Sequence, residues 1–431
     1  MPKLSVTEMF QQFLENLKID NADTISLRYG EITACLNKKF RDTESKTANS
    51  LQVGSYGRWT GIKSISDLDM LYIMPASKWD DYKNGGQSKL LTETKDAIKA
   101  RYPATTVYVD RLVVRVLYSN FHVEVQPVFE QEDGSFKYPD TYNGSSWKIT
   151  KPREEITATS ELDQQKNRNM RRLCKMARAW KNKHGVGMGG LLIDTLAHNF
   201  LKSTTDYDNK SFLHYDWLSR DFFKYLADQP DQDYYAALGS GQRVKVKQKF
   251  QKKAKKAYEL CLKAIEAENT DKVNDKWKKV YGRPFPSKAT ASKTSATKYL
   301  EWTNTEEFIE DRYSVDIRFS LKLDCEVSQN GFRQHYLTEM LTKHIPLLAN
   351  KKLKFWIDKI DVPGSYSIEW KVLNRGDESR RRDCIRGQIV KDDGYNEKIE
   401  HTQFRGNHIA ECYAIQNGVV VAKDRIEVPI S

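Results

Sequence analysis

The sequence predicts an α+β protein in which a mixed sheet with helices comes first, a helical segment follows and a β-rich segment ends the chain. Two observations support this prediction. Through residue 286, apolar residues recur mostly at helical spacing, interrupted by short runs with the pattern of strands. Beyond residue 301 the period becomes mostly two, and a stretch rich in Ser, Thr, Ala and Lys at 287–297 separates the two parts.

At 431 residues the chain is long enough for two or three domains, each with its own core. We predict a mixed core over residues 1–150, a helical subdomain over 151–286, a linker over 287–300 and a β-rich domain over 301–431, of the sandwich type. The strands predicted in the last domain are Tyr313–Glu326, Leu353–Ile360, Tyr366–Leu373, Ile385–Ile389, His408–Ile415 and Val419–Val428.

The composition favours a cytoplasmic protein that binds anions. Hydrophobic residues make up 39% of the chain, no apolar run approaches the length of a membrane span, and the first residues do not resemble a secretory signal, so we expect no membrane partner. The 70 Lys and Arg against 58 Asp and Glu give a formal charge of +12, which suits nucleotides and nucleic acid alike. The six scattered cysteines lack the spacing of a zinc site or a disulfide framework, and we expect them to be reduced.

Two amphipathic helices are predicted at the N-terminal end. The first, over Leu4–Leu17, opens with Ser5 and Glu8 at the spacing of a capping box. The second carries apolar residues at helical spacing over 25–40. A polar stretch, 41–50, then leads to a glycine-rich turn.

That turn, Gly54-Ser55, and the pair Asp67 and Asp69 carry the chemistry of the chain. The turn can hold a phosphate, and the strand that follows puts both carboxylates on one face, because side chains alternate along a strand. Two hard oxygen ligands this close suit Mg²⁺, which completes its shell with water and substrate phosphates. A lone Asp-x-Asp is otherwise a solvated loop or a structural ion pair, but here a turn precedes it and a hydrophobic strand follows. The pattern indicates nucleotidyl transfer.

Two further strands are predicted over Val107–Tyr118 and Phe121–Phe129, joined by a turn at Ser119-Asn120. If that turn has two residues, Arg115 lies directly across from Glu124. Glu124 therefore has two interpretations: a third metal ligand, or the partner of Arg115 in a structural ion pair.

Basic residues follow one stripe of a helix predicted over Glu161–Lys183, and an apolar helix is predicted over Leu191–Leu201. The usual interpretation of a basic stripe is a solvated face. A lysine-rich helix over Val246–Ala267 is also expected to present a solvated face, because no aromatic residue interleaves with its lysines. The stripe of the first helix consists of Arg168, Arg171, Lys175, Arg178 and Asn182.

Taken together, Gly54-Ser55, Asp67-x-Asp69 and the run Val-Glu-Val-Gln-Pro-Val-Phe at 123–129 resemble the bacterial relatives of cyclic GMP-AMP synthase, the CD-NTases or SMODS nucleotidyltransferases. The turn and its carboxylates are shared by the whole DNA-polymerase-β-like superfamily, so the resemblance implies that fold for residues 1–286. Trp277 to Pro286 looks like the end of the SMODS catalytic unit. Beyond the linker, the runs Trp370–Gly376, Arg386–Ile389, Gly406–His408, Glu411–Tyr413 and Ala422–Ile426 look like AGS-C, a proposed nucleotide-sensor module fused to such synthases.

The resemblance also implies roles for single residues. The catalytic carboxylates that hold two Mg²⁺ ions, or Mn²⁺ in their place, would be Asp67, Asp69 and Glu124. The residues that hold the donor nucleotide would be Gly54, Ser55 and Lys175. Many relatives have Asp where Glu124 stands, a tolerable change because either carboxylate binds Mg²⁺. Relatives often have serine at Gly189-Gly190, so a hydroxyl contact to phosphate is here lost or replaced by backbone N–H groups.

The resemblance implies a synthase that joins nucleoside triphosphates into a cyclic di- or oligonucleotide second messenger and releases pyrophosphate. The expected substrates are ATP, GTP or both, and the expected setting is bacterial antiphage signalling. A separate effector protein would respond to the messenger, and no nucleic acid is required. Two alternatives stay open: a templateless nucleotidyltransferase that acts on RNA or another acceptor, and a catalytically silent nucleotide-sensing protein. The transferase needs an acceptor, whereas a synthase converts nucleoside triphosphates alone. Three clustered carboxylates argue against the silent protein.

Overall fold

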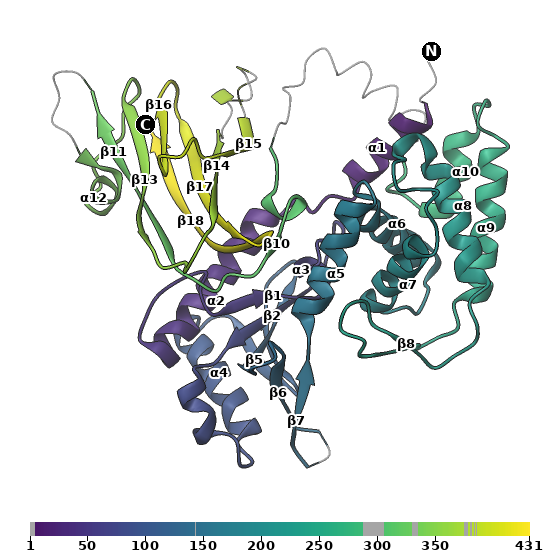
Figure 1. Cartoon of the computed structure of the whole chain (residues 1–431), viewed down its shortest axis with the longest axis horizontal. Coiled ribbons are helices and arrows are strands. Elements are labelled where there is room, and N and C mark those ends of the chain that lie inside the picture. The colour runs from purple at the N-terminus through teal and green to yellow at the C-terminus, as the bar shows by residue number, and fades with distance from the viewer. Residues whose placement is uncertain are drawn as a thin grey trace. The chain divides into compact units, whose positions relative to one another are not determined.

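The computed structural model describes residues 5–142, 144–287, 306–329, 335–374, 378–379, 382, 384 and 386–431. The chain divides into two compact units, residues 1–44 with 51–299 and residues 45–50 with 300–431 (Figure 1). From residue 288 on, the predicted linker lies outside the described residues, as do Arg375, Gly376 and Ile385. The domain boundaries proposed from the sequence stay predictions.

The first unit contains a seven-stranded sheet with helices on both faces. Its elements are α2 (Ala22–Arg41), β1 (Ser50–Gln52), α3 (Gly54–Gly57), β2 (Asp67–Ile73), η1 (Ala76–Asp81), α4 (Gln87–Arg101), β3 (Thr106–Asp110), β4 (Val113–Leu117), β5 (His122–Glu130), β6 (Phe136–Asp140) and β7 (Ser146–Thr150). The strand order is β1-β2-β5-β4-β3, with β6 pairing to β5 and β7 to β6, and β2 runs parallel to β5.

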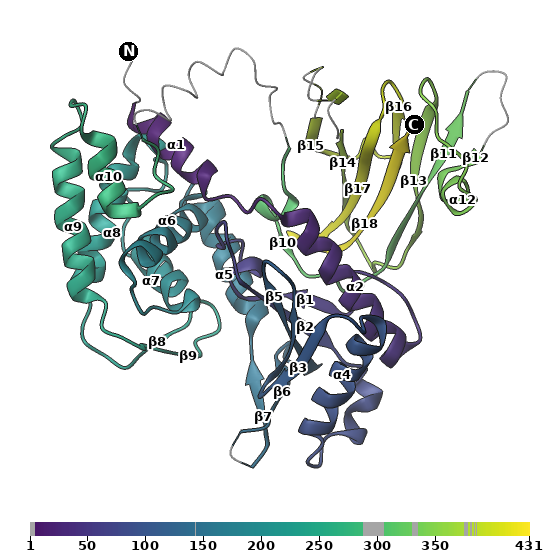
Figure 2. The ribbon, with the colours of Figure 1, turned by 180° about the vertical axis from the view of Figure 1, so that it is seen from behind.

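Both faces of this sheet are covered, as the apolar pattern of β2 requires. Helices α2 and α4 cover the face on which Leu68 and Met70 are buried. Helix α5 (Pro152–Gln165) covers the opposite face, where Leu71 packs with Ile156 (Figure 2). The predicted alternation along β2 is therefore confirmed, and Asp69 shares the face of the sheet that is turned toward α5.

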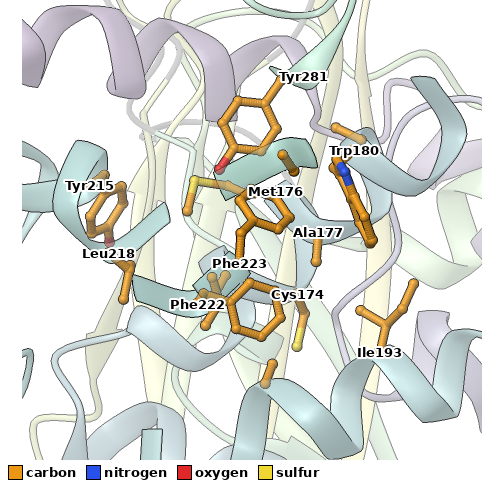
Figure 3. Packing of buried hydrophobic residues seen from close by; sticks show 14 of the residues in the cluster. Cys174, Met176, Ala177, Trp180, Ile193, Tyr215, Leu218, Phe222, Phe223 and Tyr281 are labelled. Carbon is orange, nitrogen blue, oxygen red and sulfur yellow. The ribbon is translucent and has the colours of Figure 1, made fainter. Parts of the chain in front are cut away.

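The rest of the first unit is helical and encloses one large apolar core. Its elements, besides α5, are α1 (Val6–Asn16), α6 (Asn169–His184), α7 (Gly190–Lys202), η2 (Phe212–His214), α8 (Tyr215–Ala227), β8 (Tyr234–Ala236), β9 (Arg243–Lys245), α9 (Gln251–Ile265) and α10 (Val273–Tyr281). Figure 3 shows how large side chains from different helices meet there, among them Trp180 of α6, whose ring centre lies 5.0 Å from that of Phe223 on α8. Helix α1 packs into this core, and Ser5 and Glu8 form the predicted capping box at its start.

Two predicted elements of the first unit are split in the structure. The prediction of one strand over 107–118 is wrong: β3 and β4 form a hairpin, because Arg111 adopts φ 54° and turns the chain. The prediction of one helix over 161–183 is also wrong, since α5 ends at Gln165 and α6 begins at Asn169. Between them Asn167 and Arg168 have φ 51° and 65°, a conformation that no helix continues.

The second unit is a two-layer β-structure, as the sequence predicts. Its elements are η3 (Ile309–Asp311), β10 (Ser314–Val315), β11 (Leu321–Ser328), β12 (His335–Tyr336), α12 (Leu337–Thr342), β13 (Lys352–Ile360), β14 (Ser367–Leu373), β15 (Arg386–Lys391), β16 (Glu397–His401), β17 (Gly406–Gln416) and β18 (Val419–Ile430). One sheet has the order β10-β18-β17-β14-β15 and the other β12-β11-β13-β16. The prediction of one strand over Tyr313–Glu326 is wrong, because the segment contains two strands, β10 and β11, that belong to different sheets. Side chains of both sheets, such as Phe355 and Trp370, share one core, which confirms the sandwich.

None of the described helices has both the length and the apolar character needed to cross a bilayer. All six cysteines are free thiols, and only Cys384 is partly exposed.

Candidate functional site

The glycine-rich turn is the short helix α3, and its first residue can only be glycine. Gly54 has φ +64°, and a Cβ atom on it would lie 1.8 Å from the Oδ2 atom of Asp69. The next aromatic residue, Tyr56, is buried and stacks on Tyr29 of α2 with ring centres 6.2 Å apart. The Ser55 side chain is half-buried and its hydroxyl forms no hydrogen bond with any residue that the structure describes. The turn is thus fixed by its neighbours, while its serine is available to a ligand.

The backbone of Asp69 is tied to the same turn. Its carbonyl oxygen accepts a hydrogen bond of 2.5 Å from the Tyr29 hydroxyl and one of 3.1 Å from the backbone N–H of Val53, the residue before Gly54. Strand β2 and the turn are therefore held in one register, with the Asp69 carboxylate against the face of Gly54.

The three predicted carboxylates lie on neighbouring parallel strands. Asp67 and Asp69 are on β2, and Glu124 of β5 is the register partner of Asp69. The side chain of Asp67 is 61% exposed and that of Glu124 21%. Burial, and next the negative charge of Glu124, raise the pKa of Asp69 to about 6, and the charge of Arg58 opposes this rise. A buried carboxylate beside like charges needs a counter-charge.

Glu124 is held by an ion pair. The turn at Ser119-Asn120 has two residues, as predicted, and Arg115 stands directly across from Glu124. The Arg115 guanidinium donates to the Glu124 carboxylate at 2.7 Å, and the Nε2 atom of His122 lies 3.4 Å from the same carboxylate. The ion pair that the sequence suggested is therefore present.

The three carboxylates are suited to a divalent cation by the type of their donor atoms. Among the residues that the structure describes, no three or more His, Cys, Asp or Glu side chains lie close enough together to hold a metal ion as they stand. The donor types nevertheless fit, because Asp67, Asp69 and Glu124 supply hard carboxylate oxygens on adjacent strands and the raised pKa of Asp69 reflects charge that a cation would neutralise. Binding by Glu124 requires it to exchange Arg115 for the cation.

Lys175 reaches the turn from the helical part of the same unit. Its ammonium group lies over the ring of Trp59, 5.7 Å from the ring centre, and Trp59 follows Arg58 directly after α3. Helix α6 therefore brings a cation beside the phosphate turn across a sequence separation of more than a hundred residues.

The prediction that the basic stripe of this helix is solvated is wrong for two of its members. Arg171 and Arg178 are 4% and 7% exposed. Arg178 binds Asp194 of α7 with contacts of 2.5 and 3.0 Å, and Arg171 lies 3.9 Å from Asp163 of α5. The basic side of α6 can be buried because both arginines form ion pairs with buried carboxylates.

Buried ion pairs at the turn itself were not predicted from the sequence. Arg58 donates from Nε to Asp194 at 2.9 Å and from a terminal nitrogen to Glu155 at 3.2 Å. The available signal was Asp194, the single acid in the apolar run at 191–201. An acid in such a run is buried, and a buried acid needs a basic partner.

Comparison with family models assigns both ends of the chain. Residues 4–163 match the Second Messenger Oligonucleotide or Dinucleotide Synthetase domain, abbreviated SMODS. Residues 303–431 match the Adenylyl/Guanylyl and SMODS C-terminal sensor domain, abbreviated AGS_C. The first match ends at residue 163, so it does not include the 277–286 motif.

Among solved structures, the chain is similar to CdnC of E. coli MS115-1 in its complex with HORMA-deltaN, with a TM-score of 0.49 and 15% identity over 65% of this chain and 98% of that one. It is also similar to a double mutant of the Vibrio cholerae di-nucleotide cyclase DncV, with a TM-score of 0.48 and 10% identity over 56% and 71% of the two chains. The chain matches no curated protein.

Proposed function

We propose, from the premise that the chain belongs to the SMODS nucleotidyltransferases that carry an AGS-C sensor domain, that it joins nucleoside triphosphates into a cyclic di- or oligonucleotide and releases pyrophosphate. The observation that carries the proposal is the approach of Asp69 to Gly54. A carboxylate raised in pKa to about 6 lies where a side chain on the turn would otherwise be, with a second carboxylate at its register position on the next strand. Such an arrangement places negatively charged phosphate next to acidic side chains. Their mutual repulsion is overcome only if a cation binds between them.

The residues divide the task between them. Ser55 and the turn would bind the donor triphosphate from one side and Lys175 from the other, since Lys175 lies beside Trp59 at the end of the turn. Asp67, Asp69 and Glu124 would hold two Mg²⁺ or Mn²⁺ ions, which when bound lower the pKa of the acceptor hydroxyl and neutralise charge on the leaving pyrophosphate. The 3′ or 2′ oxygen of the acceptor forms a bond to the α-phosphorus of the donor, the bond between that phosphorus and the pyrophosphate oxygen breaks, and the hydroxyl proton passes to water.

The experiment that tests this function asks whether an acceptor is needed. Purified full chain is given ATP, GTP, CTP and UTP with Mg²⁺ and release of pyrophosphate is followed. Release without any added RNA or protein supports the synthase, whereas release only after RNA is added supports a templateless transferase.

The resemblance to the CD-NTases also leads us to propose the substrates, the compartment and the biological role of the reaction. The substrates are ATP or GTP, the reaction takes place in the cytoplasm, and a separate effector protein responds to the messenger during antiphage signalling. The AGS-C domain would sense a nucleotide; its family is described as a C-terminal sensor domain.

Glu124 and its ion-pair partner provide a matched pair of variants. We expect Glu124→Gln to slow nucleotidyl transfer by at least about 10²-fold, because a metal ligand loses its charge. Arg115→Gln should keep the rate within a few-fold and cost less than about 1 kcal/mol of unfolding free energy, because the Arg115 side chain is 34% exposed and such pairs contribute little. Initial rates and urea unfolding of both variants check this. If both variants lost the same stability and kept full activity, Glu124 would be only the ion-pair partner of Arg115 and not a metal ligand.

Lys175 should affect the grip on the triphosphate. We expect Lys175→Ala to raise the KM for nucleoside triphosphate or to lower kcat by about 10-fold, since one charge-assisted contact to phosphate is lost. Lys202→Ala, at the exposed end of α7, is the control. Arg178→Ala cannot serve as one, because Arg178 is buried against Asp194. Small and equal effects of the two substitutions would show that Lys175 is a solvated lysine that makes no contact with the triphosphate.

A further inference from the structure

A cluster of four buried charged side chains joins the phosphate turn to the helical part of the first unit. Arg58, Arg178, Asp194 and Glu155 are all less than 9% exposed in their side chains. They come from the end of α3 and from α6, α7 and α5, respectively. Two cations face two anions, so the cluster is neutral as a whole. We call it the Arg58 cluster.

Asp194 is the centre of this cluster. It is completely buried and accepts hydrogen bonds from Arg58 at 2.9 Å, from Arg178 at 2.5 and 3.0 Å and from the Thr60 hydroxyl at 2.9 Å. Burial by itself would raise the pKa of Asp194, but the charges of Arg178 and Arg58 lower it to about 2. Asp194 is therefore ionised at any working pH, and two separate elements are bound to one carboxylate.

Both cations connect to residues of the donor site. The backbone N–H of Arg58 closes α3 by donating to the carbonyl of Gly54 at 3.1 Å, so the position of Arg58 sets that of the turn. Arg178 stands three residues after Lys175 on α6, which places the two side chains on the same side of that helix. Asp194 thus fixes the turn and the Lys175 helix to each other.

Stability alone does not explain such a cluster. Buried ion pairs are costly to desolvate, and apolar side chains of similar volume often replace them without loss of stability. What apolar side chains cannot supply is the direction of the hydrogen bonds. The bonds of Arg58 to Asp194 and Glu155 specify where the turn lies relative to α5, α6 and α7, and a misplacement of about 1 Å between reacting groups is enough to slow catalysis by about 10²-fold.

We propose that Arg58 is a positioning residue for nucleotidyl transfer: held by Asp194 and Glu155, it sets the distance between the Gly54-Ser55 turn and Lys175, and so the grip on the donor triphosphate. This inference rests on the proposed function. It predicts that one cation and one anion of the cluster can be removed with the fold intact and the enzyme slow.

The experiment uses the full chain with three variants. The double variant Arg58→Met with Glu155→Gln removes one cation and one anion, and leaves Asp194 paired with Arg178. Arg58→Lys keeps the charge but loses the planar fork that binds two carboxylates. Asp163→Asn is the control, because Asp163 and Arg171 form another buried pair between α5 and α6.

Three quantities are measured: the melting temperature, kcat and KM for nucleoside triphosphate, and binding of ATP by calorimetry. We expect the double variant and Arg58→Lys to lose at least about 10-fold in kcat/KM and to bind ATP more weakly, at a folded fraction equal to that of the wild type. Asp163→Asn should lose thermal stability and keep kcat/KM per folded molecule. Wild-type kcat/KM in Arg58→Lys, or a loss per folded molecule as large in Asp163→Asn, would overturn the role of Arg58.

Failure of the proposed function would look different. In that case the wild type itself would release no pyrophosphate, and the comparison between variants would reduce to ATP binding. Weaker ATP binding in Arg58→Lys than in Asp163→Asn would still support positioning of the turn, and equal binding would contradict it.

Discussion

We expect Asp69→Asn to lower the rate of nucleotidyl transfer by at least about 10²-fold, equivalent to about 3 kcal/mol of barrier. Asp69 is the carboxylate closest to the turn, with its Oδ2 atom where a Cβ of Gly54 would lie. The asparagine keeps the shape of the side chain and removes its charge, so the phosphate of the donor loses the cation that Asp69 would hold beside it. Single-turnover rates in Mg²⁺ and in Mn²⁺ measure the loss. Product formation at the wild-type rate would remove Asp69 from the catalytic residues.

The same variant should be more stable than the wild type in the absence of metal. Burial, and next the charge of Glu124, raise the pKa of Asp69 from 3.8 to about 6 in the folded protein. A raised folded pKa means that the protonated form stabilises the fold. That stabilisation is complete below the unfolded pKa and is lost as the pH rises through about 6.

At pH 7.5 the metal-free wild type therefore carries the full cost of this charge. We expect Asp69→Asn to gain about 1–3 kcal/mol of unfolding free energy there and to gain almost nothing at about pH 3, below the unfolded pKa of 3.8. Chelator-treated protein, melted at both pH values, provides the measurement. Added Mg²⁺ should then stabilise the wild type more than the variant, because a ligand stabilises the state that binds it. Equal melting temperatures of the two proteins at pH 7.5 would contradict the burial of an ionised Asp69.

Gly54→Ala should impair the enzyme nearly as severely as Asp69→Asn. The substitution adds a Cβ 1.8 Å from the Asp69 carboxylate, on a backbone with φ +64°, so either the carboxylate or the turn must move. We expect a loss of at least about 10²-fold in kcat, since the two groups that must cooperate are displaced by more than an ångström.

Gly185→Ala is the matched control for this effect. Gly185 ends α6 with φ +56°, and nothing lies within 4 Å of a Cβ built on it. It suffers the same backbone strain of about 1 kcal/mol without a collision. Its melting temperature should fall slightly while kcat stays within about 2-fold of the wild type, a change no larger than about 0.4 kcal/mol of barrier. Similar kcat values for the two variants would show that the approach of Gly54 to Asp69 has no catalytic importance.

The parts of the site that local sequence determines were predictable. Alternation along a strand placed Asp67 and Asp69 on one face, and a two-residue turn placed Arg115 across from Glu124; both are observed. Both features are local, because strand period and hairpin register depend on residues a few positions apart.

The parts that depend on distant residues were not predictable. Arg58 and Asp194 are 136 positions apart, and no periodicity in either segment indicates their pairing. The same holds for Arg178, whose place on a basic stripe suggested solvent until its partner on α7 was seen. The break at Asn167 and Arg168 was missed for another reason, since residues other than glycine rarely adopt positive φ and carry no sign of it.

The proposed synthase makes a cyclic nucleotide from nucleoside triphosphates alone, without an added acceptor. Full-length protein is incubated with all four nucleoside triphosphates and Mg²⁺ or Mn²⁺, phosphatase removes every terminal phosphate, and the surviving species are resolved by mass. We expect a phosphatase-resistant product with the mass of two or more nucleotides joined in a ring, and we expect it to be absent from the Asp69→Asn reaction. Recovery of free nucleosides only, in reactions with either cation, would contradict the proposed synthesis.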